Sequence, residues 1–395
     1  MKRFFSYIIL SFFLLLLPAG QASANNNDSI RLSLLTCAPG EEIYSLFGHT
    51  AIRYENPSQG IDVVFNYGLF SFNTPNFIFR FSLGETDYQL GATDYERFAA
   101  EYAFFGRSVW QQTLNLTDEE KTELIRLLQE NYRPENRVYR YNFFYDNCAT
   151  RPRDKIEESI AGKVIYPAEP QDGSHTFRDI VHQYCKGHPW ARFGIDLCIG
   201  SEADQPITQR QMMFAPFYLM DAFDGAQIKG DSIQRPLITA NELVVDATPE
   251  PDESSRMPTP LQCSLLLFIL TAAATIYGIR RRTGLWGIDL FLFGMAGIVG
   301  CVLAFLALFS QHPAVSSNFL LLVFHPGQLF FLPYIIYCVR KGKKCWYLTL
   351  NLMVLTLFIV LFPVIPQRFD FAVVPLALCL LIRSVSNLIV TSKKK

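Results

Sequence analysis

The sequence lacks an excess of charge of either sign. It contains 35 Lys and Arg residues against 36 Asp and Glu residues, so its net charge is −1 over 395 residues. No basic stripe occurs outside the connections between the C-terminal apolar segments. We therefore exclude a nucleic-acid partner, because binding to nucleic acid requires a concentrated positive surface.

The histidines also lack the spacing that is typical of metal ligands. Histidine is scarce, with six residues in the chain, and His175, His182 and His188 follow one another at intervals of seven and six. Zinc sites use ligands at closer spacing, typically two to four residues apart. The sequence thus predicts no metal, and nothing in it indicates another cofactor.

Long hydrophobic runs, by contrast, are plentiful. Residues 1–24 combine a basic start, an apolar run and an Ala-Ser-Ala ending, which is typical of a secretory signal peptide. Residues 25–250 are then expected to form an exported catalytic domain, and residues 251–260 a linker. Residues 261–395 contain five apolar segments, each close to the roughly 20 residues that span a bilayer as a helix: 261–279, 285–309, 319–339, 345–365 and 371–390.

The connections between these segments predict the topology. Those at 280–282 and 340–344 and the terminus at 393–395 are basic, whereas 310–318 has no Lys or Arg and 366–370 has only Arg368. Basic connections stay in the cytoplasm. We therefore expect a multi-pass protein of the inner (cytoplasmic) membrane, with its N-terminal domain in the periplasm and its C-terminus in the cytoplasm.

Four of the nine cysteines, Cys37, Cys148, Cys185 and Cys198, fall in the expected exported half. An exported domain can form disulfides, and Cys185 with Cys198, thirteen residues apart, is the plausible pair. Cys37 is expected to be a buried small hydrophobic residue. Cys148 differs because it stands in the string YDNCATR.

Local patterns place Cys148 near a helix start. Residues 49–54 and 61–67 predict a hairpin, Thr117 begins a capping box for a helix ending near residue 131, and residues 137–144 are strand-like. Asn147 is a favoured N-cap for a helix over 148–160, which would put the sulfur where the helix dipole favours a thiolate. Pro152 fits only if that helix begins a few residues later.

These residues suggest thiol chemistry, which needs a nucleophile, a base and a group that orients the base. Cys148 is the nucleophile candidate and His49 the base. Asn66 or Tyr67, on the strand beside His49, is the orienting candidate, and backbone N–H groups around Cys148 would form an oxyanion hole. Taken singly, an exported cysteine is more often structural or disulfide-bonded, and a strand histidine is more often a satisfied core residue.

Substrate-binding candidates are Asn147 beside the sulfur and two arginines, Arg151 and Arg107, which could hold a phosphate; Arg153 is a weaker one. In the apolar half, His312 lies at the outer end of the second segment and His325 about two turns into the third. Ionisable groups in a span are costly and are therefore candidates for function. The run 214–223 is apolar enough to be core.

Several strings together resemble those of the bacterial Lnb-type lipoprotein N-acyltransferase family: LTCAPG at 35–40, FGHTAIR at 47–53, FNYG at 65–68, FGR at 105–107 and YNFFYDNCATR at 141–151. The resemblance continues at 312–313 and 318–321. The order of histidine and cysteine is more distantly similar to permuted papain-like folds of the NlpC/P60 and lecithin:retinol acyltransferase type. The resemblance implies an α+β papain-like exported domain followed by a five-helix transmembrane bundle.

The resemblance also implies a reaction at the membrane. Cys148 would take an acyl chain from a phospholipid as a thioester, with His49 as base, and pass it to the α-amino group of a diacylglyceryl-cysteine lipoprotein. An alternative is a membrane-anchored cysteine hydrolase of cell-wall peptides or amides. A third hypothesis is a non-catalytic binding module in which Cys148 is structural. Five spans favour the lipid-using enzyme, since one span would tether a hydrolase.

Overall fold

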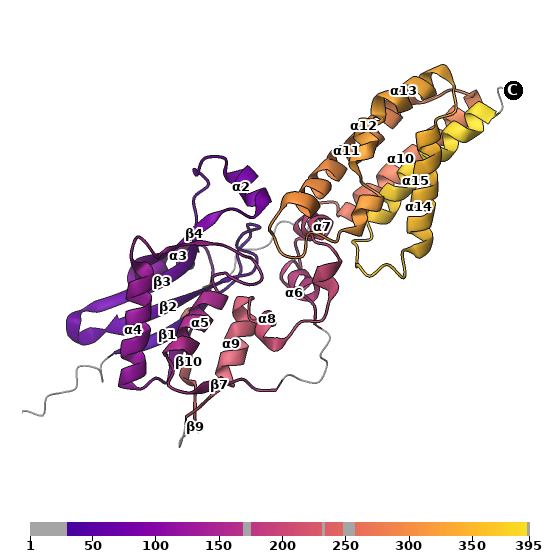
Figure 1. Cartoon of the computed structure of the whole chain (residues 1–395). Coiled ribbons are helices and arrows are strands. Elements are labelled where there is room, and N and C mark those ends of the chain that lie inside the picture. The colour runs from indigo at the N-terminus through magenta and orange to yellow at the C-terminus, as the bar shows by residue number, and fades with distance from the viewer. Residues whose placement is uncertain (1–29, 169–174, 231–233, 248–256, 393–395) are drawn as a thin grey trace, which may run out of the picture.

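The computed structural model describes residues 30–168, 175–230, 234–247 and 257–392, arranged as an N-terminal α+β domain and a C-terminal helical domain (Figure 1). This order of classes confirms the predicted α+β domain followed by apolar helices. Its likeness to a papain fold stays a prediction. The predicted signal peptide and residues 251–256 of the predicted linker lie outside the described residues.

The N-terminal domain is built on one antiparallel sheet of seven strands, in the order β10-β5-β1-β2-β3-β4-β6. A second, three-stranded sheet has the order β7-β8-β9. The strands are β1 (Arg31–Cys37), β2 (His49–Asn56), β3 (Ile61–Leu69), β4 (Asp87–Asp94), β5 (Val109–Leu114), β6 (Val138–Arg140), β7 (Lys163–Ile165), β8 (Gln227–Lys229), β9 (Gln234–Pro236) and β10 (Ile238–Val245).

The predicted hairpin is confirmed, with β2 and β3 paired antiparallel from Ala51 opposite Asn66 to Asn56 opposite Ile61. A short 3-10 turn, η1 (Pro57–Gln59), joins them, and Gly60 closes the turn with a φ of 65°. The hairpin lies near the middle of the sheet, so both strands have neighbours on each side. The hairpin therefore holds the backbone of His49, at the start of β2, in a rigid position.

Helices cover the sheet and connect it to the rest of the chain. In the α4 helix the predicted capping box is present, and Leu124 and Leu128 pack in the main core with Ile156 of α5. The predicted core run also holds, because Phe214, Leu219 and Phe223 are buried. The helices of this domain are α2 (Phe77–Leu83), α3 (Tyr95–Phe104), α4 (Asp118–Tyr132), α5 (Thr150–Ser159), α6 (Phe177–Tyr184), α7 (Pro189–Cys198), η2 (Ser201–Asp204), α8 (Gln209–Met212) and α9 (Pro216–Asp224).

Two local predictions need correction around the cysteine. The predicted strand over 137–144 is only three residues long, as β6, and the chain then turns through a bridge between Asn142 and Asp146. The helix begins at Thr150 rather than at Cys148. Pro152 explains the shift, since proline fits the first turn of a helix, where its missing N–H has no intrahelical partner.

The expected disulfide is not formed. Cys185 and Cys198 are both free thiols, and so are the other seven cysteines, all of which lie in described residues. Cys185 caps the end of α6 and is buried in a small core, whereas Cys198 ends α7. The prediction of this pair was based on spacing alone. In the structure, the arrangement of α6 and α7 leaves the two sulfurs unbonded.

The C-terminal domain contains α10 (Pro260–Arg281), α11 (Trp286–Phe309), α14 (Trp346–Leu361) and α15 (Val373–Ser392). Among the described helices, α10, α11 and α15 are long and apolar enough to cross a bilayer. The predicted span at 319–339 is not one helix. It is divided into η4 (Phe319–Leu322), α12 (Pro326–Phe330) and α13 (Leu332–Lys341).

The break in that span has a local cause. The pair 319–330 and 332–341 is bent by 73°, and Pro326 and Pro333 stand on either side of the bend. Proline removes a helix hydrogen bond and disfavours helical backbone in the residue before it. Counting the bent pair as one crossing gives four, and α14, with 16 residues, is shorter than a usual span. The count of five stays a prediction.

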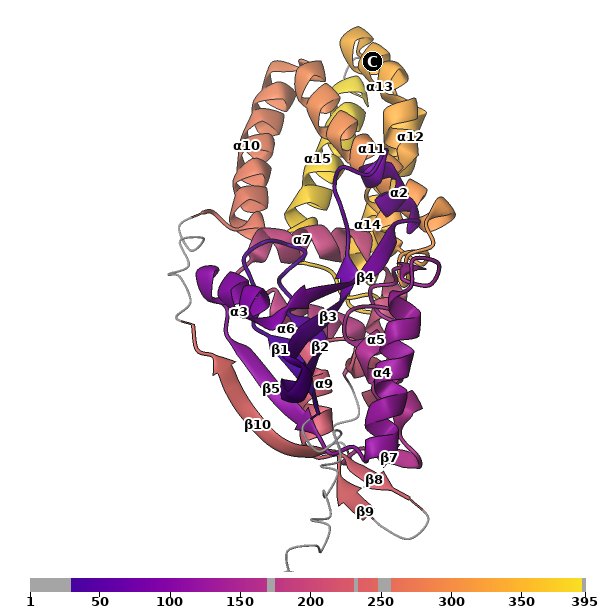
Figure 2. The ribbon, with the colours of Figure 1, turned by 90° about the vertical axis from the view of Figure 1, so that its left-hand side faces the viewer.

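The two domains are docked through α7, which lies across the near ends of the bundle helices (Figure 2). Its Phe193 and Leu197 pack against the bundle core. Arg368, the single basic residue of the connection 366–370, donates to Asp179 at 2.6 Å and to Asp204 at 3.0 Å. This arginine thus binds the N-terminal domain, in agreement with a connection on the same side as that domain.

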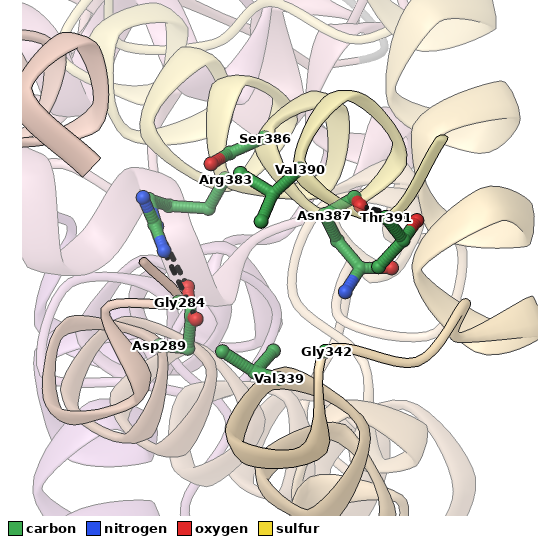
Figure 3. Close-up of a pocket in the computed structure, with 9 residues that line it drawn as sticks. All are labelled: Gly284, Asp289, Val339, Gly342, Arg383, Ser386, Asn387, Val390 and Thr391. Atoms are coloured by element: carbon green, nitrogen blue, oxygen red, sulfur yellow. Dashed lines mark hydrogen bonds and ion pairs between the residues drawn. The ribbon is translucent and has the colours of Figure 1, made fainter. Parts of the chain in front are cut away.

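A buried ion pair fixes the far end of the bundle. Asp289 of α11 faces Arg383 of α15 (Figure 3), with nitrogen–oxygen distances of 2.7 and 3.0 Å, and both side chains are 2% exposed. The hollow beside them measures about 10 Å³, which is room for about one water molecule. It is too small for a lipid, so we assign the pair a structural role.

Removing one member of this pair should destabilise the bundle strongly. Arg383→Leu leaves Asp289 as an uncompensated buried charge, and we expect a loss of roughly 3–5 kcal/mol in the free energy of unfolding. The double variant Asp289→Leu/Arg383→Leu should recover most of that loss. Thermal unfolding in detergent measures both, and equal unfolding temperatures for the single and double variants would contradict the assignment.

Candidate functional site

Asn147 holds the turn that carries Cys148. Its side-chain oxygen accepts from the N–H groups of Ala149 at 2.8 Å and Thr150 at 2.9 Å, and its amide nitrogen donates to the carbonyls of Phe143 at 2.8 Å and Phe214 at 2.9 Å. The residue is 3% exposed. Asn147 is thus not the predicted N-cap of α5, which is Ala149, but its side chain holds the turn just before the helix, and its polar atoms are occupied by the protein itself.

The Cys148 sulfur sits half-buried at the end of this turn. The backbone N–H of Thr50 and the N–H of Cys148 itself both donate toward the sulfur. Burial nevertheless raises the pKa of the thiol to about 11, and the two N–H groups act against this rise. At neutral pH the thiol of Cys148 is therefore protonated.

His49 is positioned by the backbone before it. Gly48 has a φ of +76°, and a Cβ there would lie 2.5 Å from the carbonyl oxygen of Cys37, so only glycine fits. Burial lowers the pKa of His49 to about 4. The hydrogen bond to Asn66 raises the pKa in part, and the positive charge of Arg107 lowers it further. At neutral pH the imidazole is therefore uncharged, which is the state that can accept a proton.

Asn66 is the partner of His49, and Tyr67 is not. The Nε2 of His49 lies 3.2 Å from the side-chain oxygen of Asn66. An amide oxygen can only accept a hydrogen bond, so Nε2–H donates to it and Nδ1 is the basic nitrogen. Tyr67 points the other way and donates to Asn131 at 2.8 Å. Adjacent strand residues face opposite sides of a sheet, so only one of the two could reach the histidine.

Cys148 and His49 come together through β2 and β3. Thr50, the residue after His49, donates to the sulfur. On β3, Gly68 has a φ of +91° at a register shift against β4, and a Cβ there would lie 3.5 Å from the Cβ of Cys148. The kinked strand thus leaves room for the cysteine turn beside the histidine. The cysteine turn therefore lies against the start of β2, about a hundred positions away in the chain, where His49 stands.

Tyr139 belongs to the same group and was not predicted. It is 7% exposed, its hydroxyl has no hydrogen-bond partner among the described residues, and it would lie 4.0 Å from a Cβ on Gly68. Burial, followed by the proximity of Cys148, raises its pKa, so the hydroxyl stays protonated and can donate. No sequence signal marked this residue, because it depends on β6 pairing with β4.

Arg151 and Arg107 take different places around the site. Arg151 binds Asp146 with two bonds of 2.6 and 2.7 Å and lies 3.5 Å above the ring of Tyr139. Arg107 donates to the carbonyl of Ala38 at 2.8 Å, is half-buried, lies 4.7 Å above the ring of Tyr102, and forms no ion pair with the acidic residues that the structure describes. Arg151 therefore supports Tyr139, whereas Arg107 keeps its charge available near His49.

Three other candidates lie outside this group. Arg153 is buried and donates to Asp154 and to the carbonyl of Arg210. The Nε2 of His312 donates to the carbonyl of Phe81 in α2 at 2.6 Å. His325 is the N-cap of α12, inside the bundle, and its ring lies 6.1 Å from that of Tyr347. The structure brings none of the three next to Cys148.

Cys37 forms the back of the site. It stands opposite His49 in the β1–β2 register, it is buried as predicted, and the hydroxyl of Tyr102 donates to its sulfur. Burial raises its pKa to about 12, above that of Cys148. Of the two thiols in this region, Cys148 alone is half-exposed and receives backbone N–H groups.

Comparison with known proteins identifies the family. The Lnb N-terminal periplasmic domain matches residues 20–183, and the Lnb transmembrane domain matches residues 252–395. No curated protein and no solved structure matches the chain significantly. The first match contains Cys148, His49, Asn66 and Tyr139, and the second contains the whole helical domain. The chain, with a periplasmic N-terminal domain and a transmembrane anchor, therefore belongs to the Lnb family.

Proposed function

We propose that the protein is a lipoprotein N-acyltransferase that carries the acyl chain as a thioester on Cys148. Family membership supports a role in lipoprotein processing at the membrane. The observation that supports the chemistry is the placement of a thiol with two N–H donors, one of them from Thr50, against the start of β2, where the neutral His49 is hydrogen-bonded to Asn66. A nucleophile, a base and an orienting group are what acyl transfer requires.

In the first step, the Cys148 sulfur attacks the carbonyl carbon of a phospholipid ester while Nδ1 of His49 takes the thiol proton. The carbonyl oxygen becomes an oxyanion, which the N–H groups of Thr50 and Cys148 and the hydroxyl of Tyr139 are placed to stabilise. The C–O bond then breaks. His49 returns the proton to the leaving oxygen, and the products are a lysophospholipid and an acyl-thioester.

In the second step, the α-amino nitrogen of a diacylglyceryl-cysteine lipoprotein attacks the thioester carbonyl. His49 takes a proton from the nitrogen, the C–S bond breaks, and the proton goes to the departing sulfur. An amide is formed and the thiol is restored. Neutral histidine suits both steps, because the same nitrogen must accept a proton twice and release it twice.

Substrate recognition is proposed for Arg107. Its guanidinium lies near His49 and is half-exposed, so a phospholipid phosphate can approach it without displacing a protein carboxylate. We place the enzyme in the inner membrane with a cytoplasmic C-terminus. The basic residues at the ends of α10 and α13 support this orientation, since they lie at the bundle end away from the periplasmic domain (Figure 1).

The acyl-thioester itself tests the proposal. Purified full-length protein is incubated with phospholipid vesicles in the absence of lipoprotein, and the Cys148 peptide is weighed by mass spectrometry. We expect an added acyl mass on the wild-type peptide that neutral hydroxylamine removes. In Cys148→Ser the peptide should carry either no acyl group or an ester that resists hydroxylamine. An enzyme that transfers acyl chains but never carries such an adduct would contradict the mechanism.

Tyr139 gives a narrower prediction. Tyr139→Phe keeps the ring that Arg151 covers and removes only the unpartnered hydroxyl. We expect kcat for N-acylation to fall by roughly 10²-fold, the loss typical of one oxyanion donor. The rate at which iodoacetamide alkylates Cys148 should not change, because alkylation forms no oxyanion. Equal losses in both rates would indicate a structural role.

A further inference from the structure

The α2 helix exposes an apolar surface beside the bundle. Its sequence is FIFRFSL, with Ile78 80% exposed and Phe79 58% exposed. Its one charge, Arg80, is turned back to the protein, where it binds the carbonyl of Glu85 and the carboxylate of Asp87. A soluble domain would leave such a surface in water at considerable cost, so a covering environment is required.

Contacts with α11 show what that environment is. The ring of Phe79 lies 5.9 Å from that of Phe305, the N–H of Gln311 donates to the carbonyl of Leu83, and His312 binds the carbonyl of Phe81. Both views place α2 against the near end of the bundle (Figures 1 and 2). The helix is thus attached to a segment that crosses the membrane.

The depth of this contact can be read from helix geometry. Phe305 stands four residues before the end of α11 at Phe309, about 6 Å inside it at 1.5 Å per residue. The 24 residues of α11 extend about 36 Å, which exceeds the roughly 30 Å hydrocarbon core by about 3 Å at each end. Phe305, and with it Phe79, therefore lies just inside the hydrocarbon boundary.

Aromatic rings continue from α2 to the site. Phe77 stacks on Phe70 at 5.7 Å, Phe70 contacts Tyr88 at 5.0 Å, and Tyr88 stacks on Tyr141 at 4.2 Å. Tyr88 and Tyr141 are close enough to Cys148 for its charge to affect their pKa values. The aromatic row, defined here as these four residues, is a continuous line of packed rings from the membrane-level helix to the neighbourhood of the sulfur. Tyr88 is buried within it, and the other three rings are partly exposed.

We propose that α2 is inserted in the outer leaflet of the membrane, and that the aromatic row guides the acyl chain of a phospholipid from there to Cys148. The lipid contact depends only on the geometry of α2 and α11. The guiding role rests on the proposed function. The occupant of the exposed surface is the bilayer itself, since the neighbouring surface of α11 at this depth is already a membrane surface.

Photocrosslinking tests the lipid contact without reference to activity. The photoreactive residue p-benzoylphenylalanine replaces Ile78 in full-length protein, which is reconstituted into vesicles of phosphatidylethanolamine and phosphatidylglycerol. The matched control replaces Ile165, which is 41% exposed in β7 at the far end of the periplasmic domain (Figure 2). We expect at least tenfold more lipid adduct at position 78 than at position 165. Equal adducts, or a crosslink to protein alone, would overturn the insertion of α2.

A substitution tests the guiding role. Ile78→Asp puts a charge into the leaflet without disturbing packing, and Ile165→Asp is its control. We expect at least a tenfold loss of acyl transfer from vesicle phospholipid with Ile78→Asp, and a change within twofold in the acylation of Cys148 by a soluble short-chain nitrophenyl ester. Undiminished transfer from vesicles would overturn the guiding role. If the wild-type protein transfers no acyl chain from either the phospholipid or the nitrophenyl ester, the proposed function is refuted instead. The photocrosslinking result alone would then show whether α2 is inserted in the membrane.

Discussion

Replacing Cys148 with alanine is expected to abolish N-acylation of lipoproteins, with a rate loss of roughly 10⁴-fold or more. The loss is this large because the sulfur forms the covalent intermediate, and the geometry offers no second nucleophile. Cys37, the other thiol in the region, is fully buried and accepts a hydrogen bond from Tyr102. Its pKa is higher than that of Cys148. Mass spectrometry of lipoprotein N-termini, in cells that lack the native copy and are complemented with each variant, measures the effect.

The control for this prediction is Cys198→Ala. Cys198 is also a free thiol in the periplasmic domain and is also only partly buried, but it ends α7 at the junction with the bundle. Cells that carry it should contain fully N-acylated lipoproteins. If Cys148→Ala cells also retain N-acylation, Cys148 is structural and the acyl-thioester mechanism is wrong. If N-acylation is unchanged even without the protein, the lipoprotein assignment fails.

Loss of the His49 imidazole is expected to have the second largest effect. His49→Ala should lower kcat/KM by roughly 10²- to 10⁴-fold, the contribution typical of general base catalysis. The thiol pKa of about 11 leaves almost no thiolate at neutral pH, so the reaction depends on transfer of the proton to this base. The control Tyr67→Phe should keep nearly full activity, because the Tyr67 hydroxyl binds Asn131 and not His49.

The pH profile distinguishes a base from a structural histidine. His49 accepts a proton only when it is neutral, so activity should be lost as pH falls through its pKa of about 4, not through the ordinary value of 6.5. Asn66→Asp puts a carboxylate against Nε2 and should raise that pKa, so the acid limb should move to higher pH. A profile that is the same for wild type and Asn66→Asp would show that His49 is not the titrating base.

Local chemistry made part of the site predictable. The capping box at Thr117 and the hairpin from 49 to 67 depend on neighbours in the chain, and the structure has both. Asn147 does bond the backbone before α5, but the N-cap is Ala149. Even the corrections are local in origin. Pro152 moved the start of α5, and Pro326 and Pro333 divided a hydrophobic run whose length had indicated a single helix.

The choice between Asn66 and Tyr67 could not be made in this way. Both are polar, adjacent and on the correct strand, and which of them reaches His49 depends on the register of β3 against β2. A shift of one residue would exchange their faces. Tyr139 and α2 depend on still longer contacts, between β6 and β4 and between the two domains. No periodic pattern reports such contacts.

The sequence by itself determined the order of an α+β domain and an apolar helical domain, the side of the membrane expected for each connection and the residue types suited to thiol chemistry, because hydrophobic period, charge and capping act over a few residues. Only the tertiary structure decided that Asn66 rather than Tyr67 hydrogen-bonds His49, that the buried Tyr139 hydroxyl has no partner among the described residues, and that α2 contacts α11. Strand register and domain packing bring together residues far apart in the chain, and these depend on the whole fold.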